Sequence, residues 1–154
     1  MITKFKLFEN SIFKYDEDNR NNDENIYYFD TSDGWEYKVS FHKKQIDFDR
    51  SNSEIFYIGF KSKKAEEYFH DDKVITNSVD FYKVARTIID IIKQHYNKYK
   101  PLQYIFTATN KGTEDYKEEF IKTKAYKKYL NQYFPTWKIE HDSENINRLN
   151  IYTN

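Results

Sequence analysis

The stretch between residues 81 and 99 constrains the fold more than any other part of the sequence. Its apolar and ring-bearing residues recur at intervals of three and four positions, the pattern of a helix that packs one face on a core. They are Phe81, Val84, Ala85, Ile88, Ile92, His95, Tyr96 and Tyr99. Asn77 and Ser78 are suited to cap its start, and Pro101 ends it because the residue before proline resists the helical conformation. The sequence therefore predicts a helix from Asn77 to Lys100.

Strand patterns precede this helix. Residues 35–42 alternate strictly, with Trp35, Tyr37, Val39 and Phe41 on one face, which is typical of a half-buried strand. Residues 54–61 carry apolar groups on both faces and predict a central strand. Residues 26–31 predict another strand, and shorter ones are expected at 46–48 and 74–76.

The second half of the chain predicts a strand, a helix and a hairpin. Residues 102–109 are rich in β-branched and aromatic groups, and a second helix runs from a cap at Thr113 to Pro135. Residues 136–141 and 146–153 flank a polar turn. The order, β-rich and then α-β-α-β-β, predicts an α+β fold. We expect an antiparallel or mixed sheet of about five to seven strands with two helices packed on one face.

Domain organisation follows from length and from one polar stretch. The chain has 154 residues, close to the commonest domain size, so we expect a single domain over residues 1–154. Residues 15–25 are almost wholly polar and mostly acidic. We interpret them as a mobile loop.

Composition limits the function classes. Aromatic residues make up 19% of the chain, which indicates an ordered core because disordered chains are poor in aromatics. The 25 basic and 25 acidic residues cancel, which removes the simplest argument for a nucleic-acid or membrane partner. There is no cysteine and no apolar run long enough to span a bilayer. We expect no membrane association and a location in the cytoplasm.

The sequence does not match the common catalytic and metal-binding signatures. The four histidines lack the spacing of H-E-x-x-H, no G-x-S-x-G elbow occurs, and Lys111-Gly112 reverses the order of a phosphate-binding loop. The densest cluster of ligand-capable groups is His70, Asp71 and Asp72, for which a solvated loop is the favoured interpretation and a metal site the alternative. We expect no cofactor and no enzymatic activity. A small transferase or metal-assisted hydrolase, built around residues 66–72 or 109–113, is a further alternative.

Basic and aromatic residues interleave in both predicted helices, at residues 93–100 and 122–133. Such stretches track a phosphate backbone while their rings stack on bases, and they are equally typical of a helix with lysines outside and tyrosines inside. The candidate partner-binding residues are Tyr96, Tyr99, Tyr126, Tyr133, Lys127 and Lys128. A nucleic-acid-binding module that uses these helix faces is therefore one alternative.

Residues 74–107 carry a recognisable pattern. A strand ends in Thr76, the helix contains Phe-Tyr-Lys-Val-Ala-Arg-Thr-Ile-Ile, and a Lys-Pro turn leads to a Tyr-Ile-Phe-Thr strand. With the strands at 37–41 and 56–60, the chain resembles, over about residues 35–109, small uncharacterised proteins found widely in bacteriophages. Those proteins often open the second helix with an Arg and a Leu-Tyr pair, where this chain has Glu118-Glu119-Phe120, so no role of that Arg transfers.

The resemblance implies a bacteriophage or mobile-element origin and is silent on mechanism. It implies that the expected cytoplasm is that of a bacterial host cell, with virion association as the alternative. Together with the absence of convergent chemistry, it leads to the hypothesis of a non-enzymatic phage accessory protein that acts by protein–protein binding. Its partner is expected to be a virion component or a host factor such as a defence system. Abundant tyrosine, a residue type enriched at interfaces, supports this hypothesis.

Overall fold

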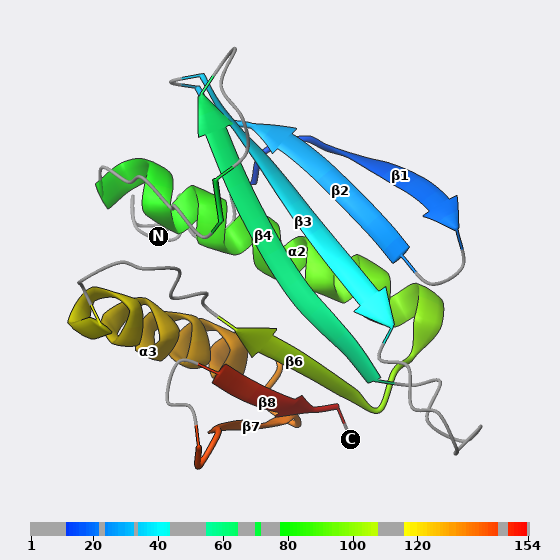
Figure 1. The fold of residues 1–154 in the computed structure, drawn as a ribbon, viewed down its shortest axis with the longest axis vertical. Coiled ribbons are helices and arrows are strands. Elements are labelled where there is room, and N and C mark those ends of the chain that lie inside the picture. The colour runs from blue at the N-terminus through cyan, green and yellow to red at the C-terminus, as the bar shows by residue number, and fades with distance from the viewer. Residues whose placement is uncertain are drawn as a thin grey trace, which may run out of the picture.

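The computed structural model describes residues 12–21, 24–32, 34–43, 55–64, 70–71, 78–107, 116–144 and 148–153. In these residues, seven strands form one mixed sheet in the order β1-β2-β3-β4-β6-β8-β7, and the short β5 pairs with β4 beside this path. Both helices lie on the same face of the sheet (Figure 1). The strands are β1 (Tyr15–Asn21), β2 (Glu24–Asp30), β3 (Trp35–Lys43), β4 (Ile55–Lys64), β5 (His70–Asp71), β6 (Gln103–Thr107), β7 (Lys138–His141) and β8 (Arg148–Tyr152). The helices are α2 (Ser78–Tyr99) and α3 (Tyr116–Tyr133). The α+β prediction is confirmed.

One parallel pair divides an otherwise antiparallel sheet. Strand β4 pairs in parallel with β6, with Phe56 opposite Tyr104, and α2 makes the crossover between them. Strands β7 and β8 form the predicted hairpin, and β8 lies between β6 and β7. The strand expected at 74–76, which would have preceded the crossover helix, lies outside the described residues, as does the one at 46–48. The observed parallel partner of β6 is β4.

The core lies between the sheet and the helices. Alternate residues of the central strands point to the helix side and are buried, as the period of two requires. They include Tyr27, Phe29, Tyr37, Val39, Phe41, Phe56, Ile58, Phe60, Tyr104, Phe106, Leu149 and Ile151. On the opposite face, Asp16, Tyr28, Lys38 and Lys61 stand side by side in one row across four strands. One face of the sheet is thus aromatic and buried, and the other is mostly polar.

The prediction of a mobile loop over residues 15–25 is wrong. Residues 15–21 form β1, which pairs antiparallel with β2 from Glu24 onward. Tyr15 donates a hydrogen bond from its hydroxyl to Asp90 of α2 (2.9 Å), and the Phe13 amide donates to the Thr87 hydroxyl (2.9 Å). The strand is polar because it lies at the edge of the sheet, where charged side chains are common.

The turn after β2 forms where the sequence indicates one. Thr31 accepts a hydrogen bond from the Gly34 amide, and its own amide donates to the carbonyl of Trp35 (2.7 Å). Gly34 has φ near 87°, a conformation that side chains disfavour, so glycine is required there. The turn sets β3 antiparallel to β2, with Phe29 opposite Tyr37.

Candidate functional site

Cations alternate with tyrosine or isoleucine along one side of α2. The positions involved follow one another at intervals of four and three residues, so they share one helix face. They are Tyr82, Arg86, Ile89, Lys93, Tyr96 and, directly after the helix, Lys100, and we call them the α2 stripe. Tyr82, Lys93 and Lys100 are exposed, whereas Ile88 and Ile92 on the sheet-facing side are buried.

Helix α3 runs beside the α2 stripe and adds two rings to it. Tyr129 meets Tyr82 edge to face, with ring centroids 6.0 Å apart. One turn further along both helices, the Arg86 guanidinium lies 4.1 Å from the centroid of the Tyr133 ring. We call the α2 stripe together with Tyr129 and Tyr133 the α2–α3 seam.

Between Arg86 and Asn97 of α2 the seam contains an open pocket of about 260 Å³, which we call the seam pocket. The connection from α3 to β7 supplies its aromatic wall. Phe134 stacks on Trp137 with centroids 3.9 Å apart and planes inclined by 6°, and Tyr96 meets Trp137 edge to face at 5.0 Å. The lining residues are Arg86, Ile89, Lys93, Tyr96, Asn97, Tyr133, Phe134 and Trp137.

The seam pocket is electropositive. Two of the residues that line it are cations, and none of them is acidic. Within the described part of the chain, Nε of Arg86 is buried and has no hydrogen-bond partner. Leaving a buried donor unsatisfied costs about 1–3 kcal/mol, more when the group is charged. Flat rings and guanidinium donors together suit a ligand with a planar apolar part and an anionic group.

Charge is segregated across the molecule although the chain is neutral overall. Helices α2 and α3 together contain nine Lys and Arg residues against four Asp and Glu. Strands β1 and β2 contain five acidic residues and a single Arg. The two helices therefore carry an excess of positive charge, and strands β1 and β2 an excess of negative charge.

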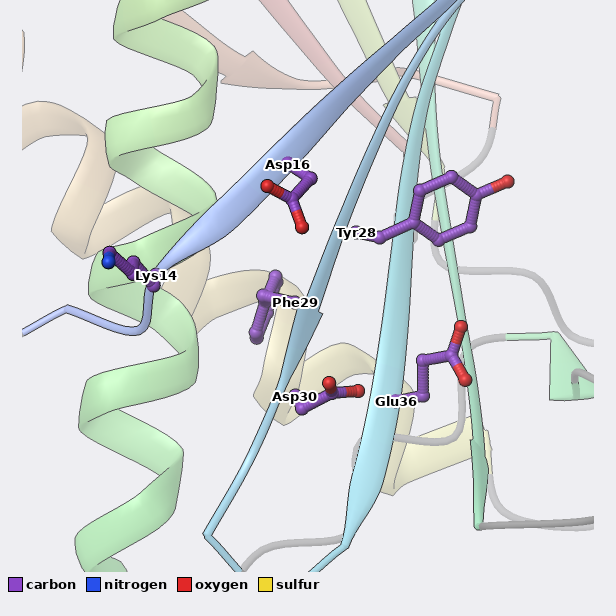
Figure 2. Close-up of a pocket in the computed structure, with 6 residues that line it drawn as sticks. All are labelled: Lys14, Asp16, Tyr28, Phe29, Asp30 and Glu36. Carbon is purple, nitrogen blue, oxygen red and sulfur yellow. The ribbon is translucent and has the colours of Figure 1, made fainter.

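An acidic cleft of about 280 Å³ lies at that edge (Figure 2). Asp16 of β1, Asp30 of β2 and Glu36 of β3 line it together with the Tyr28 ring. Lys14 also lines the cleft, and Glu36 forms an ion pair with Lys63 at 3.6 Å. This surface complements a basic group.

The buried polar centre of the molecule is His95 of α2. Its side chain has no exposed area and stacks on Phe41 with centroids 4.0 Å apart. Nδ1 lies 2.7 Å from the Tyr104 hydroxyl, and Nε2 lies 3.2 Å from Oδ1 of Asn25. Because the Asn25 oxygen only accepts, Nε2 carries the hydrogen and Nδ1 accepts from Tyr104.

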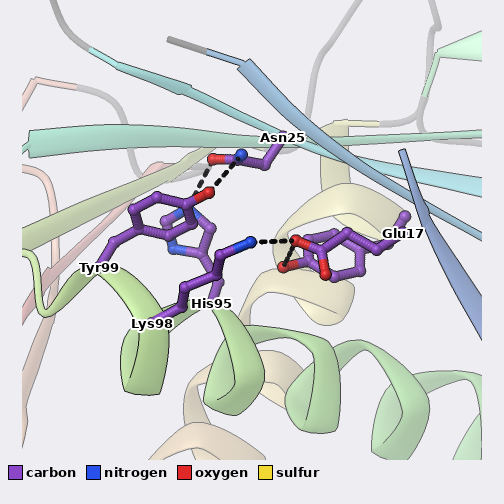
Figure 3. Close-up of polar contacts among 6 residues, drawn as sticks. Glu17, Asn25, His95, Lys98 and Tyr99 are labelled. Atoms are coloured by element: carbon purple, nitrogen blue, oxygen red, sulfur yellow. Dashed lines mark hydrogen bonds and ion pairs between the residues drawn. The ribbon is translucent and has the colours of Figure 1, made fainter. Parts of the chain in front are cut away.

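Burial and, secondarily, the nearby Lys98 ammonium lower the pKa of His95 to about 3. Figure 3 shows Asn25 between His95 and Tyr99, whose hydroxyl accepts from the Asn25 amide at 2.8 Å. Lys98 instead reaches Glu17 of β1 at 3.3 Å. These contacts tie α2 to β1, β2 and β6. Both ring nitrogens of His95 therefore have partners in the core, and a neutral, enclosed imidazole is positioned for structure rather than for proton transfer.

The structure brings together only some of the candidate partner-binding residues. Tyr96 and Tyr133 both line the seam pocket, whereas Tyr99 turns away toward Asn25. Tyr126 is 3% exposed and packs on Phe60 and Phe106 in the core, so its ring does not offer a surface to a partner.

The two candidate lysines occupy different sides of α3. The helical period of 100° per residue places Lys128 opposite the sheet-facing Tyr126 and Leu130, and it is exposed. The same period places Lys127 on the flank away from Tyr129, where it is half-buried. Lys128 therefore shares the outer surface of the helix layer with the α2 stripe, and Lys127 does not.

Three residues of the seam pocket, Arg86, Phe134 and Trp137, are not among the candidates predicted from the sequence. Arg86 stands within the helix pattern, and its four-and-three spacing to Tyr82, Ile89 and Lys93 is a signal that identifies the stripe. Phe134 and Trp137 follow α3, and nothing in their local sequence places them against α2.

The candidate metal cluster is only partly described. His70 and Asp71 form β5, with Asp71 opposite Lys61 and His70 opposite Ser62, so the loop expected there contains a strand. Asp72 lies outside the described residues. Among the residues with described positions, no group of three or more histidine or acidic side chains is arranged to hold a metal ion.

Neither α2 nor α3, over the parts described, has the length and apolar character needed to cross a lipid bilayer. Comparisons with protein-family models, with curated proteins and with solved structures found no match to the chain. The resemblance to small bacteriophage proteins stays a prediction from the residue pattern. Functional inference therefore depends on the surfaces described above.

Proposed function

We propose that the protein is a non-enzymatic binding protein that holds single-stranded nucleic acid on its α2–α3 seam. The combination of cations and tyrosine rings along the seam supports this proposal most directly. Proteins that bind single strands combine a positive track for the backbone with aromatic rings on which bases stack. The seam supplies both features in one line from Tyr82 to Lys100.

The dimensions of the seam suit a short stretch of strand. Eighteen residue steps separate Tyr82 from Lys100, about 27 Å at the helical rise of 1.5 Å per residue. Cations recur along that length at Arg86, Lys93 and Lys100, and Lys128 lies on the same outer surface. Four such cations would give a slope of log affinity against log salt of about −3, at about −0.7 per phosphate contact.

The zero net charge of the chain argues against a nucleic-acid ligand only if the charges are evenly distributed over the surface. A neutral chain binds a polyanion when its cations are gathered on one surface and its acids on another, because potentials near a surface depend on local charge. The acidic residues of β1 and β2 lie on the part of the sheet away from α3. They do not border the seam pocket.

Protein–protein binding is the second candidate function, favoured by the acidic cleft of Asp16, Asp30 and Glu36. A basic partner side chain complements this cleft. Under the phage origin that the resemblance implies, the partner would be a virion component or a host factor. If so, purified protein should recover a specific partner from host lysate, and an Asp16→Asn/Asp30→Asn variant should not.

Nucleic-acid binding is tested by fluorescence anisotropy with a labelled oligothymidylate of about twelve nucleotides, titrated between about 50 and 200 mM salt. We expect binding with a salt slope of about −3. The variant Lys93→Gln/Lys128→Gln should bind more weakly and reduce the magnitude of that slope by about 1.4, because two phosphate contacts are removed.

The matched control is Lys38→Gln/Lys61→Gln, which removes the same charge from the opposite face of the sheet. We expect this control to bind like the unmodified protein. Equal weakening by both pairs would refute the assignment to the seam, and absence of salt-sensitive binding would refute the function.

A further inference from the structure

We propose that the seam pocket is a subsite for one unstacked nucleobase together with its neighbouring phosphate. This inference rests on the proposed function and deepens it, because it assigns a ligand unit to the pocket of the seam. A base next to a phosphate occurs both in a nucleotide within a strand and in a free nucleoside monophosphate. The Trp137, Tyr96 and Phe134 wall would take the base, and Arg86 with Lys93 would take the phosphate.

The size of the pocket limits the ligand to one ring system. Its volume of about 260 Å³ is below the range of about 300–1,000 Å³ typical of sites for drug-sized ligands. A base therefore enters only after it has left its own stack. Duplex bases are stacked and paired. Placing a base in the pocket therefore costs less free energy for a single strand than for a duplex.

The aromatic wall is already formed without a ligand. Phe134 and Trp137 are stacked at 3.9 Å, and Tyr96 braces the indole edge to face. Trp137 is only 8% exposed, and the partly buried Phe134 and Tyr96 complete the wall. A fixed aromatic surface loses little conformational entropy on binding, which favours stacking of a flat ligand.

Arg86 is positioned for the anionic group. Its guanidinium is held over Tyr133 at 4.1 Å, while its buried Nε has no acceptor in the described part of the chain. The Lys93 ammonium belongs to the same lining. A phosphate oxygen at this position would meet charge-assisted donors without competition from a carboxylate of the pocket.

A peptide with an aromatic side chain beside an acid is the competing occupant. The pocket favours a nucleotide because four of its eight lining residues are aromatic and only Ile89 is aliphatic. Base stacking on aromatic rings contributes about 1–3 kcal/mol per base, equivalent to about fivefold to a hundredfold in affinity.

The test uses tryptophan fluorescence of a Trp35→Phe variant, which leaves Trp137 as the single tryptophan of the chain. We expect both thymidine monophosphate and the oligothymidylate to quench it, and inorganic phosphate not to. We also expect a duplex of equal length to bind more weakly than the single strand. Arg86→Gln should weaken binding of both thymidine ligands about tenfold. The control Tyr82→Leu, at a seam residue that does not line the pocket, should weaken binding of the oligonucleotide only.

The outcomes separate this inference from the proposed function. Salt-sensitive oligonucleotide binding without quenching of Trp137, and with Arg86→Gln unchanged, would overturn the subsite and leave the function standing. Quenching by the monophosphate without oligonucleotide binding would support the subsite and overturn the function. Tighter binding of an Asp-Tyr-Asp peptide than of thymidine monophosphate would overturn the subsite in favour of a protein ligand. Circular dichroism of each variant shows whether it is folded.

Discussion

At the scale of single residues, His95 shows how a polar group is accommodated in an aromatic core. Both ring nitrogens have partners, Tyr104 and Asn25, and the ring itself stacks on Phe41. The helix pattern of the sequence places His95 correctly on the buried face. Its partners come from β2 and β6, which are distant in the chain, so the sequence does not identify them.

His95 should make the protein sensitive to acid. Its pKa is about 6.5 without the fold and about 3 within it, so the unfolded state binds the extra proton as pH falls between those values. Stability contributed by the neutral imidazole is therefore complete above about pH 6.5, is lost as pH falls, and declines no further below about pH 3. Urea unfolding at pH 7 and pH 4.5 measures this loss.

The variant His95→Phe isolates the effect. We expect it to be less stable at pH 7 by about 2–5 kcal/mol, because the Asn25 and Tyr104 groups lose a partner. Its stability should also change less between pH 7 and pH 4.5 than that of the unmodified protein. His42→Gln, at a histidine 51% exposed on the opposite face, is the control. An unchanged pH dependence in His95→Phe would contradict the assignment.

At the scale of elements, the sequence predicts what periodic patterns determine. Helix α2 and strands β3, β6, β7 and β8 are confirmed close to their expected bounds, because each has a clear apolar period. The same patterns do not predict that β4 pairs with β6 or that β8 inserts beside β6. Those pairings depend on contacts between distant segments.

Strand β1 lies where the sequence predicts a loop. Its outward residues are acidic because they face solvent at the sheet edge, and this composition resembles that of a loop. What makes the segment a strand is its pairing with β2 and its contacts to α2, neither of which is visible in the local sequence.

Tyr15 should be a main anchor of β1. Burial and the Asp90 carboxylate raise its pKa above the usual value, so its hydroxyl stays protonated and donates to Asp90. We expect Tyr15→Phe to destabilise the protein by about 0.5–1.5 kcal/mol, as a lost hydrogen bond does. It should also speed amide hydrogen exchange in β1 more than in β6. Tyr57→Phe, at an exposed tyrosine of β4, is the control and should change neither quantity.

At the scale of the whole molecule, the arrangement of charge carries more information than its total. Equal numbers of acids and bases argue against a nucleic-acid partner only if they are mixed on the surface. The two helices instead carry nine cations against four acids, and strands β1 and β2 carry five acids against one Arg. The tertiary arrangement also creates the seam pocket, because Trp137 reaches Tyr96 across 41 positions of sequence.

The central claim is that single-stranded nucleic acid lies along the α2–α3 seam. Titration of the ¹⁵N-labelled protein with oligothymidylate, followed by two-dimensional NMR, locates the contact surface on the chain. We expect amide shifts concentrated at residues 82–100 and 128–137, with the Trp137 indole signal among the largest. Shifts concentrated on β3 and β4, or none at concentrations that saturate anisotropy, would contradict the claim.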